Sequence, residues 1–418
     1  MPTPGFWRTL EPRERTTLLA AAGGWAVDAF DFNLYGLVVP ALIALWGISR
    51  PQAGLAATAA LLTSALGGWL AGALSDRLGR VRVLQLTIAW FAGLSLLAGC
   101  ARSFPELLAV RALQGLGFGG EWAVGAALMA EAIKPALRGR AVGTVQSAWA
   151  LGWGLAAALY AAAFSFLPAA LAWRALFWAG TLPALLIVYV RRRVPEHARP
   201  AAAPGRHGRL LDIFAPVIIG RTALAALMAT GMQGGYYAIT TWLPTYLKTV
   251  RRLSVLDTGS YLMVIIAGSF AGYLTAAWAS DRLGRRVTFA LFALGSLLIA
   301  VGYTLAPIDD RAMALLGFPL GFFVSGNFSG VGAFFAELFP GPVRGAGMGF
   351  AYSVGRGAGA LFPALVGLLS ARLPLGAAIG AFASSAYLVV LIAVALLPET
   401  RALAAATNEA AVRDPALT

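Results

Sequence analysis

Long apolar stretches separated by short polar segments dominate the chain. Twelve stretches can be counted, and most are close to the ~20 residues that an α-helix needs to cross ~30 Å of hydrocarbon. They lie at residues 18–45, 53–74, 83–101, 105–132, 141–166, 172–191, 215–247, 258–279, 287–306, 312–336, 344–370 and 376–397. The pattern predicts an all-α membrane protein with twelve transmembrane helices.

The composition agrees with a membrane protein. Of the 418 residues, 59% are hydrophobic and 12% are charged, whereas ordinary soluble domains carry about 25% charged residues. The single cysteine, Cys100, excludes a disulfide framework and a paired-cysteine metal or redox site. No cleavage pattern of a signal peptide precedes the first apolar stretch, so we expect that stretch to be a retained span.

The positive charge is unevenly distributed between the two sides of the predicted bundle. The net charge of +14 would suit nucleic acid, but the basic residues lie in short loops and form no single basic face. One set of alternate loops holds most of them. Because cytoplasmic loops are enriched in Lys and Arg, we expect both termini in the cytoplasm and no nucleic-acid partner. The compact length without a leader favours a bacterial inner (plasma) membrane.

An internal repeat divides the chain into two halves. The segment SDRLGR at 75–80 recurs unchanged at 280–285, and an Ala-Glu pair followed by Arg-Gly recurs at nearly the same offset, about half the chain length. The repeat predicts two pseudo-symmetric six-helix bundles in parallel orientation. The predicted units are residues 1–192 (N-terminal bundle), 193–213 (cytoplasmic linker) and 214–418 (C-terminal bundle). Parallel halves place a solute site between them, reached alternately from either side.

The motifs resemble those of the major facilitator superfamily over essentially the whole chain. Residues 72–82 resemble its loop signature between spans two and three, which the second half repeats. The fourth span is similar to the superfamily's pattern there, with Arg111 followed by Gly115, Gly117, Gly119 and Gly120. Pro195-Glu196 and Pro398-Glu399-Thr400 resemble the half-ending motifs of sugar porters and related symporters. The resemblance implies the twelve-span fold and alternating access.

Two short strings favour a subgroup within that superfamily. Asp28-Ala29-Phe30-Asp31 and Gly119-Gly120-Glu121-Trp122 look like proton-coupled metabolite symporters, with sialate, lactate and aromatic-acid carriers as the nearest types. The Gly-Pro motif of drug antiporters is missing from residues 143–164. The resemblance therefore implies proton-coupled uptake of a metabolite.

Ionisable residues inside predicted spans are candidates for proton coupling, because burying them in the bilayer costs several kcal/mol. Asp28 and Asp31 are three residues apart, which places them ~60° apart on one helix face, so we expect them to titrate as a coupled pair. Glu121 is a second protonation site or a polar wall. The resemblance assigns Arg111 to proton transfer or to fixing the span-one acid, with snorkelling to the outer interface as the alternative.

Arg356 is the candidate for substrate recognition. It lies near the middle of the eleventh stretch, and a fixed guanidinium suits bidentate binding of a carboxylate; a structural ion pair is the alternative. The three acids Asp28, Asp31 and Glu121 outnumber Arg111 and Arg356 by one. A bound carboxylate would worsen that imbalance and a proton would relieve it, which favours symport.

Polar and aromatic mid-span residues are candidates to line the substrate cavity. They are Asn33, Tyr35, Gln146, Trp149, Gln233, Tyr236, Tyr237, Asn327 and Tyr352. Helix packing is the alternative for Trp149. Asn327 corresponds to Glu121 in the repeat. The stretch 215–247 is long for one span, so we expect a broken helix near Gln233.

The charged loop motifs are predicted to form an intracellular latch between the bundles, with charge pairs that break in one conformation. The candidates are Asp76, Arg77, Arg80, Glu131, Arg138, Asp281, Arg282, Arg285, Glu337 and Arg344. A purely topogenic role is the alternative for the arginines.

The favoured function is secondary active transport of a small organic acid as a proton symporter. We expect a monomer in the lipid bilayer whose partners are a small organic anion and H⁺. No metalloprotease, paired Cys/His, phosphate-loop or GxSxG motif is found, so we expect no enzyme, no catalytic residues, no cofactor and no metal site. The alternatives are a facilitative uniporter or exporter of a neutral sugar-like or other small metabolite, and a non-transporting membrane sensor.

Overall fold

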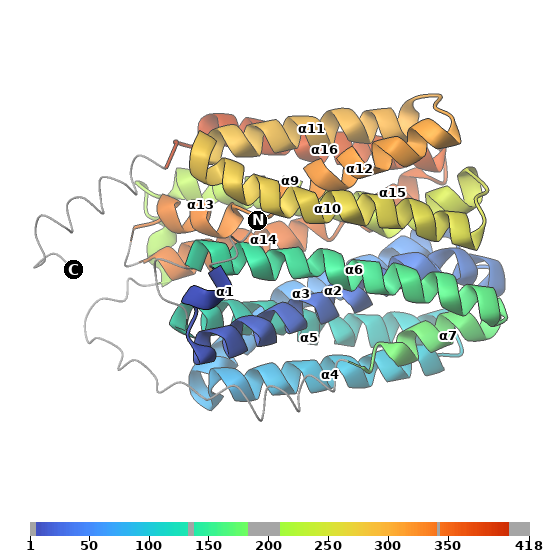
Figure 1. Cartoon of the computed structure of the whole chain (residues 1–418), viewed down its shortest axis with the longest axis horizontal. Helices are drawn as coiled ribbons and strands as arrows, with labels where there is room; N and C mark the ends of the chain where they lie inside the picture. Colours follow the sequence, from blue (N-terminus) through green and yellow to red (C-terminus); the bar gives the residue numbers. More distant parts are fainter. Residues whose placement is uncertain (1–5, 133–137, 183–209, 341–342, 401–418) are drawn as a thin grey trace, which may run out of the picture.

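The computed structural model describes residues 6–132, 138–182, 210–340 and 343–400. The regular elements of this part are helices that run side by side along one direction (Figure 1). They are α1 (Phe6–Thr9), α2 (Pro12–Trp46), α3 (Arg50–Leu78), α4 (Arg80–Cys100), α5 (Phe104–Ala132), α6 (Arg138–Phe166), α7 (Ala169–Ala179), η2 (Leu210–Phe214), α9 (Ile219–Thr245), η3 (Tyr246–Val250), α10 (Val255–Leu283), α11 (Arg285–Leu305), α12 (Asp310–Gly326), α13 (Val331–Leu338), α14 (Arg344–Gly359), α15 (Phe362–Leu369) and α16 (Leu375–Leu396).

The described helices follow the twelve predicted stretches. Nine helical segments in the described part are long and apolar enough to cross a membrane. The three other predicted spans correspond to α5, α7 and α9, and the sixth is described only as far as Leu182. The predicted linker, residues 193–213, lies largely outside the described residues, so the bundle boundaries stay a prediction.

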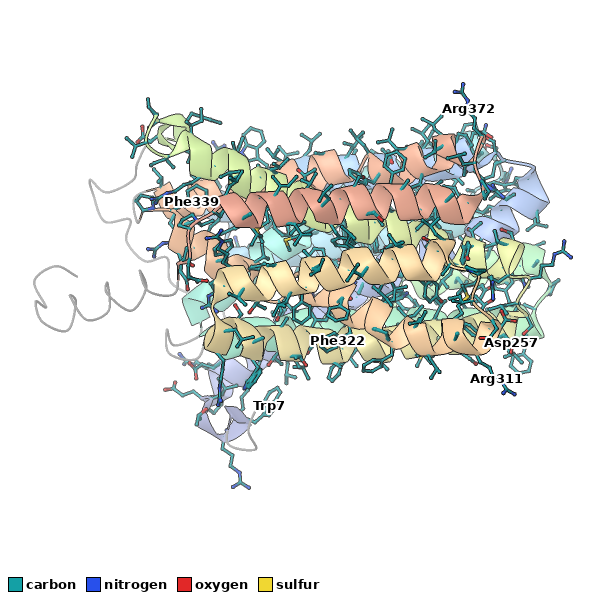
Figure 2. The ribbon with its side chains drawn as sticks, turned by 90° about the horizontal axis from the view of Figure 1, so that it is seen from above. Trp7, Asp257, Arg311, Phe322, Phe339 and Arg372 are labelled. Carbon is teal, nitrogen blue, oxygen red and sulfur yellow. The ribbon has the colours of Figure 1, made fainter. Side chains whose placement is uncertain are left out.

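The outer surface is apolar along the helices. Leucines such as Leu66, Leu155, Leu298 and Leu315 are more than half exposed, which a soluble monomer could not tolerate over so large an area. The charged residues Asp257, Arg311 and Arg372 lie at one end of the bundle, and Trp7 and Phe339 mark the other end, with Phe322 between the two ends (Figure 2). We call the end with Trp7 the terminus face, and the other the opposite face.

Each half is built around two close helix pairs. In the N-terminal half, α2 to α7, helix α3 packs on α5 and α2 on α6; in the C-terminal half, α9 to α16, helix α10 packs on α12 and α9 on α16. Gly119 of α5 packs directly on the carbonyl group of Ser64, and Gly321 of α12 packs in the same way on that of Ile265. No side chain fits at either glycine, so the repeat seen in the sequence is also a repeat of packing.

The two halves meet along three pairs of spans. Helix α6 packs against α10, α2 against α9, and α3 against both α14 and α15. The interface therefore contains spans one, two, five, seven, eight and eleven. The mid-span acids of α2 lie on one side of it and Arg356 of α14 on the other.

The structure corrects the expected position of helix breaks. Helix α9 is continuous through Gln233, and its irregularity is a π-helical turn at Tyr246–Val250. The breaks lie in spans ten and eleven: between Gly326 and Val331, and between Gly359 and Phe362. Glycine, asparagine and serine interrupt the first, and Pro363 follows the second, where proline has no N–H to bond to the carbonyl of Gly359 four residues earlier.

Candidate functional site

A cavity of about 30 Å³ lies between the two halves, and Arg356 lines it. The other lining residues are mostly aromatic and come from both halves: Trp25, Phe118, Gln146, Trp149, Tyr236, Tyr237, Tyr273, Phe328 and Tyr352. Arg356 is 5% exposed and lies in the last turn of α14, where the negative end of the helix dipole stabilises a cation. The break in span eleven therefore places a guanidinium inside an aromatic cavity.

The contacts of Arg356 are mainly with rings and hydroxyl groups. Its Cζ lies 5.1 Å from the ring centre of Phe118 and 5.3 Å from that of Tyr352, so the ring faces attract the cation. The guanidinium also interacts with the hydroxyl groups of Tyr237 and Tyr352 and with the carboxylate of Asp28. These contacts hold the guanidinium inside the cavity, where its charge suits an anionic ligand.

Hydrogen bonds across the interface hold the cavity walls together. Trp149 donates from Nε1 to the Tyr236 hydroxyl at 2.5 Å, which joins α6 to α9. Gln146 donates from Nε2 to the Phe328 carbonyl at 3.3 Å, which joins α6 to the break in span ten. Four residues predicted or found at the cavity thus link the two halves directly, and any opening of the cavity must lengthen these bonds.

Asp31 lies in a separate polar network inside the N-terminal half. Its Oδ2 is 3.2 Å from Nη1 of Arg111 and accepts a 2.8 Å hydrogen bond from Nε2 of Gln114. The Ser95 hydroxyl donates to Oδ1. Gln114 also accepts from Arg111 at 2.7 Å and donates to Ser95 at 2.7 Å. The carboxylate therefore has a buried cation and two further donors of its own.

Arg111 is buried, and the snorkelling alternative does not describe it. It is 4% exposed, and its Cζ lies 5.0 Å from the ring centre of Tyr35. A second, smaller cavity of about 10 Å³ is lined by Arg111, Tyr35, Asn33 and residues of α9. A volume of that size is close to the minimum for one buried water, roughly 10–15 Å³. Asn33 and Tyr35 thus lie next to Arg111 and away from Arg356.

The structure separates the two acids of α2 instead of pairing them with each other. Asp28 is fully buried, as is Asp31, but Asp28 acts electrostatically on Arg356 whereas Asp31 binds Arg111. The two acids thus lie near different cations, and their titration as a coupled pair stays a prediction. The side chain of the third predicted acid, Glu121, lies outside the described residues.

Two of the residues predicted to line the cavity lie in the layer behind its lining side chains. Gln233 accepts from the Tyr237 hydroxyl at 3.0 Å and donates to the Tyr352 carbonyl at 3.1 Å. Asn327 donates to Ser296 Oγ at 3.0 Å, a contact between α12 and α11. Gln233 therefore orients two lining tyrosines, and Asn327 supports the break in span ten.

Sequence reasoning missed several residues of both sites. They are Phe32, Ser95, Phe118, Tyr273 and Phe328. Phe118 could have been found, because it lies seven residues after Arg111 and therefore on the same helix face. Ser95 gave no signal, since a serine in an apolar span usually bonds to its own helix.

The cavity is closed toward the opposite face by contacts between α3 and the break in span eleven. Thr58 donates to the Ala360 carbonyl at 2.6 Å and accepts from the Ala364 amide at 3.2 Å. Arg50 donates to the Ser370 carbonyl at 3.2 Å. The helix break leaves backbone groups without helical partners, and a residue of the other half satisfies them.

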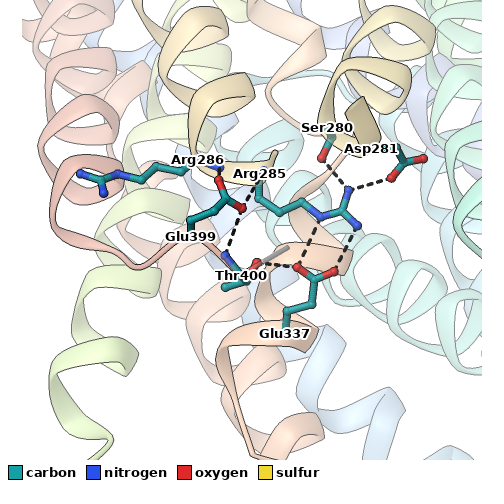
Figure 3. A network of polar contacts seen from close by, with 7 residues as sticks. All are labelled: Ser280, Asp281, Arg285, Arg286, Glu337, Glu399 and Thr400. Carbon is teal, nitrogen blue, oxygen red and sulfur yellow. Dashed lines mark hydrogen bonds and ion pairs between the residues drawn. The ribbon is translucent and has the colours of Figure 1, made fainter. Parts of the chain in front are cut away.

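The second-half loop motif forms a charge network at the terminus face (Figure 3). Arg285 lies 2.8 Å from Asp281 and 3.1 Å from Glu337. Glu399 accepts from the backbone amides of Arg285 and Arg286, each at 3.0 Å, so an acid stabilises the positive end of α11. Its neighbour Thr400 bonds to Glu337, so the half-ending motif belongs to this network.

The described part of this network lies within the C-terminal half. Its members come from α10, α11, α13 and the segment that follows α16. Arg282 turns aside to Trp278, with its Cζ 5.2 Å from the ring centre, and Arg344 and Arg77 are exposed. The side chains of the first-half candidates Asp76, Arg80, Glu131 and Arg138 lie outside the described residues. A latch between the bundles stays a prediction.

Curated relatives match nearly the whole chain. A probable 4-methylmuconolactone transporter of Cupriavidus pinatubonensis is 42% identical over 96% of this chain and 94% of its own length. The cis,cis-muconate transport protein of Acinetobacter baylyi is 29% identical over 82% of this chain and 84% of its own length.

The fold is also that of a solved carrier. The crystal structure of a D-xylose-proton symporter superimposes with a TM-score of 0.74, at 19% identity, over 93% of this chain and 99% of that one. This confirms the predicted twelve-span fold with two pseudo-symmetric bundles. The sequence profile of the Major Facilitator Superfamily matches residues 21–318 and 276–416. The chain therefore belongs to the major facilitator superfamily of membrane transporters.

Proposed function

We propose that the protein carries a small, unsaturated or aromatic organic acid across the membrane together with a proton. The observation that carries this proposal is the buried guanidinium of Arg356 within an aromatic cavity formed by both halves. Arginine presents a planar pair of donors that matches a carboxylate. The carboxylate of the substrate binds there, and its unsaturated part stacks on the surrounding rings.

The relatives support this substrate class. The two bacterial transporters reported above are named for muconolactone and muconate, which are unsaturated carboxylic acids. At 42% identity over nearly the whole chain, the substrate chemistry of the first relative is a sound guide to the class. A neutral sugar-like solute would offer Arg356 no carboxylate to bind, so it would make no use of the guanidinium in the cavity.

The size of the cavity supports alternating access. About 30 Å³ has room for about two waters and not for an organic acid. Binding therefore requires the halves to separate around the site. The Thr58 contacts close the opposite face, so the described arrangement is one end of a cycle in which each face opens in turn.

Buried charges support proton coupling. Asp28 and Asp31 on α2 and Arg111 on α5 each lie within about one helix turn of one of the two cavities. All three residues are buried. An incoming carboxylate adds a negative charge to this region, and a proton cancels it. The basic loops and bacterial relatives support placement in a bacterial inner membrane with both termini in the cytoplasm.

Uptake into proteoliposomes tests the proposal. With an inward proton gradient, we expect accumulation of 4-methylmuconolactone or a related unsaturated acid and no accumulation of D-xylose. Arg356→Gln should reduce acid uptake at least about a hundredfold, because a buried charged hydrogen-bond partner is lost, and Arg356→Lys should restore part of it.

Arg372→Gln is the matched control, since Arg372 is exposed at the opposite face. It should transport like the wild type. Accumulation of the sugar in preference to every acid tested, or full acid uptake by Arg356→Gln, would contradict the proposal. Acid uptake that only equilibrates and that an inward proton gradient does not raise would support a uniporter instead.

A further inference from the structure

The helical spacing of α2 presents its two acids to different surroundings. Trp25, Asp28 and Phe32 recur at intervals of three and four residues, which places them on one face. Trp25 packs on Trp149 at 5.0 Å between ring centres, and Phe32 packs on Phe118 at 5.7 Å. Asp28 is fully buried and lies between Trp25 and Phe32 on this face, and Trp25, Trp149 and Phe118 line the aromatic cavity.

Asp31 belongs to the neighbouring face of α2. Tyr35 lies four residues after Asp31, and its ring packs against the guanidinium of Arg111. Asp31 itself accepts hydrogen bonds from Arg111, Ser95 and Gln114. All of these partners are on α2, α4 and α5, within the N-terminal half. Among the described residues, Arg111 balances the charge of Asp31, and Arg111 is not one of the residues that line the aromatic cavity.

Asp28 shares its cation with the substrate site. The carboxylate acts electrostatically on Arg356, which comes from α14 of the other half. The other titratable groups around this cation are the neutral hydroxyl groups of the cavity tyrosines: Tyr236, Tyr237, Tyr273 and Tyr352. On its own helix Asp28 has Asp31 as neighbour, whose charge Arg111 balances; the side chain of Glu121 on α5 lies outside the described residues.

We propose that Asp28 is the internal counter-ion of Arg356, that the substrate carboxylate replaces it, and that Asp28 then holds the transported proton. This assignment rests on the proposed function and names its coupling residue. In the empty carrier, Asp28 and Arg356 balance each other. When the substrate anion pairs with Arg356, Asp28 takes one proton from the medium, and no net charge enters the low-dielectric cavity.

The cycle reverses on the other side of the membrane. The substrate leaves, Asp28 releases its proton to that side, and the carboxylate returns to Arg356. One proton moves with each monocarboxylate, and both the loaded and the empty cavity are neutral as they cross. Asp31 stays paired with Arg111 throughout, so it sets the position of α2 and does not carry the proton.

Binding of 4-methylmuconolactone to the purified protein, measured by tryptophan fluorescence and calorimetry between pH 5.5 and 8, tests the assignment. For the wild type we expect affinity to fall about tenfold for each pH unit once Asp28 is ionised, because one proton is taken up per acid bound. In Asp28→Asn the affinity should lose this pH dependence and stay near the low-pH value. The same variant should exchange labelled acid across vesicles but not accumulate it.

Asp31→Asn is the matched control. It should alter the level of affinity or transport but keep the pH dependence of binding. Asp28→Glu should also keep that dependence, which guards against a variant that is merely misfolded, and the melting temperature of each variant reports its folding. Binding in Asp28→Asn that still weakens tenfold per pH unit, or loss of the dependence in Asp31→Asn, would overturn the assignment. A wild type that binds no organic acid at any pH would overturn the proposed function itself.

Discussion

The residues of the Asp31 site are packed so closely that a neighbouring glycine is part of the packing. Gly180, just after α7, lies beside Asp31 and Ser95: a Cβ there would meet Oδ1 of Asp31 at 2.8 Å and Oγ of Ser95 at 2.9 Å. Gln114 bonds to Arg111, Ser95 and Asp31 at once. Displacing one member of such a network disturbs the others.

The variant Gly180→Ala should therefore impair transport without removing a charge. Overpacking of this kind costs about 1–3 kcal/mol, and we expect proton-driven uptake to fall about tenfold as the Asp31 site shifts. Gly93→Ala is the control, because a Cβ at Gly93 meets no atom within 4 Å. Equal uptake by both variants would show that the close contact at Gly180 is not needed.

The sequence could predict the ionisable candidates for these sites, but not how they group into two separate sites. Asp28, Asp31, Arg111 and Arg356 stand out because charges are rare in apolar stretches. Their partners depend on which helices meet, and the spacing of three residues on α2 is compatible with one shared site or with two. The role of Ser95 could not be predicted from the sequence, because it depends on α4 packing next to α2 and α5.

At the scale of elements, the break in span eleven organises the cavity. It ends α14 just after Arg356 and leaves the Ala360 carbonyl and the Ala364 amide for Thr58 of α3. One threonine of the N-terminal half thus completes the backbone bonding of the C-terminal half on the side of the opposite face. Closure of that face depends on this pair of bonds.

Thr58→Val should destabilise the closed opposite face. Valine keeps the shape but leaves two buried backbone groups unsatisfied, at about 1–3 kcal/mol each. We expect faster thiol modification of a reporter at Ala57→Cys, a residue that lines the smaller cavity, in a Cys100→Ser background. Thr63→Val is the control, since Thr63 bonds only within α3 among the described residues. Unchanged modification in Thr58→Val would show that these bonds do not close the face.

The helices could be predicted from hydropathy, but their interruptions could not. Apolar stretches locate spans because the bilayer requires them. The expectation of a broken α9 near Gln233 rested on length, yet the extra length is used by a continuous helix and a π-helical turn at Tyr246–Val250. The breaks lie where Asn327 or Pro363 interrupts glycine-containing segments, and such segments also occur in helices that stay continuous.

At the scale of the whole molecule, the sequence repeat is also a repeat of helix packing, but the two halves carry different ionisable residues. Gly119 and Gly321 make equivalent close contacts in the two halves, which the recurring motifs anticipated. The chemistry is not repeated: the N-terminal half holds the acids of α2, and the C-terminal half holds Arg356 in a broken span. In the proposed cycle, substrate and proton therefore meet where the halves meet, and motion between the halves acts on both.

Proton movement during substrate uptake tests the central claim most directly. Proteoliposomes of the wild-type protein, given 4-methylmuconolactone in weakly buffered medium without a pre-set gradient, should make the external medium more alkaline as the acid enters. The account predicts one proton for each molecule taken up and no dependence of the rate on an imposed membrane potential. Uptake of the acid without a matching proton influx would contradict it.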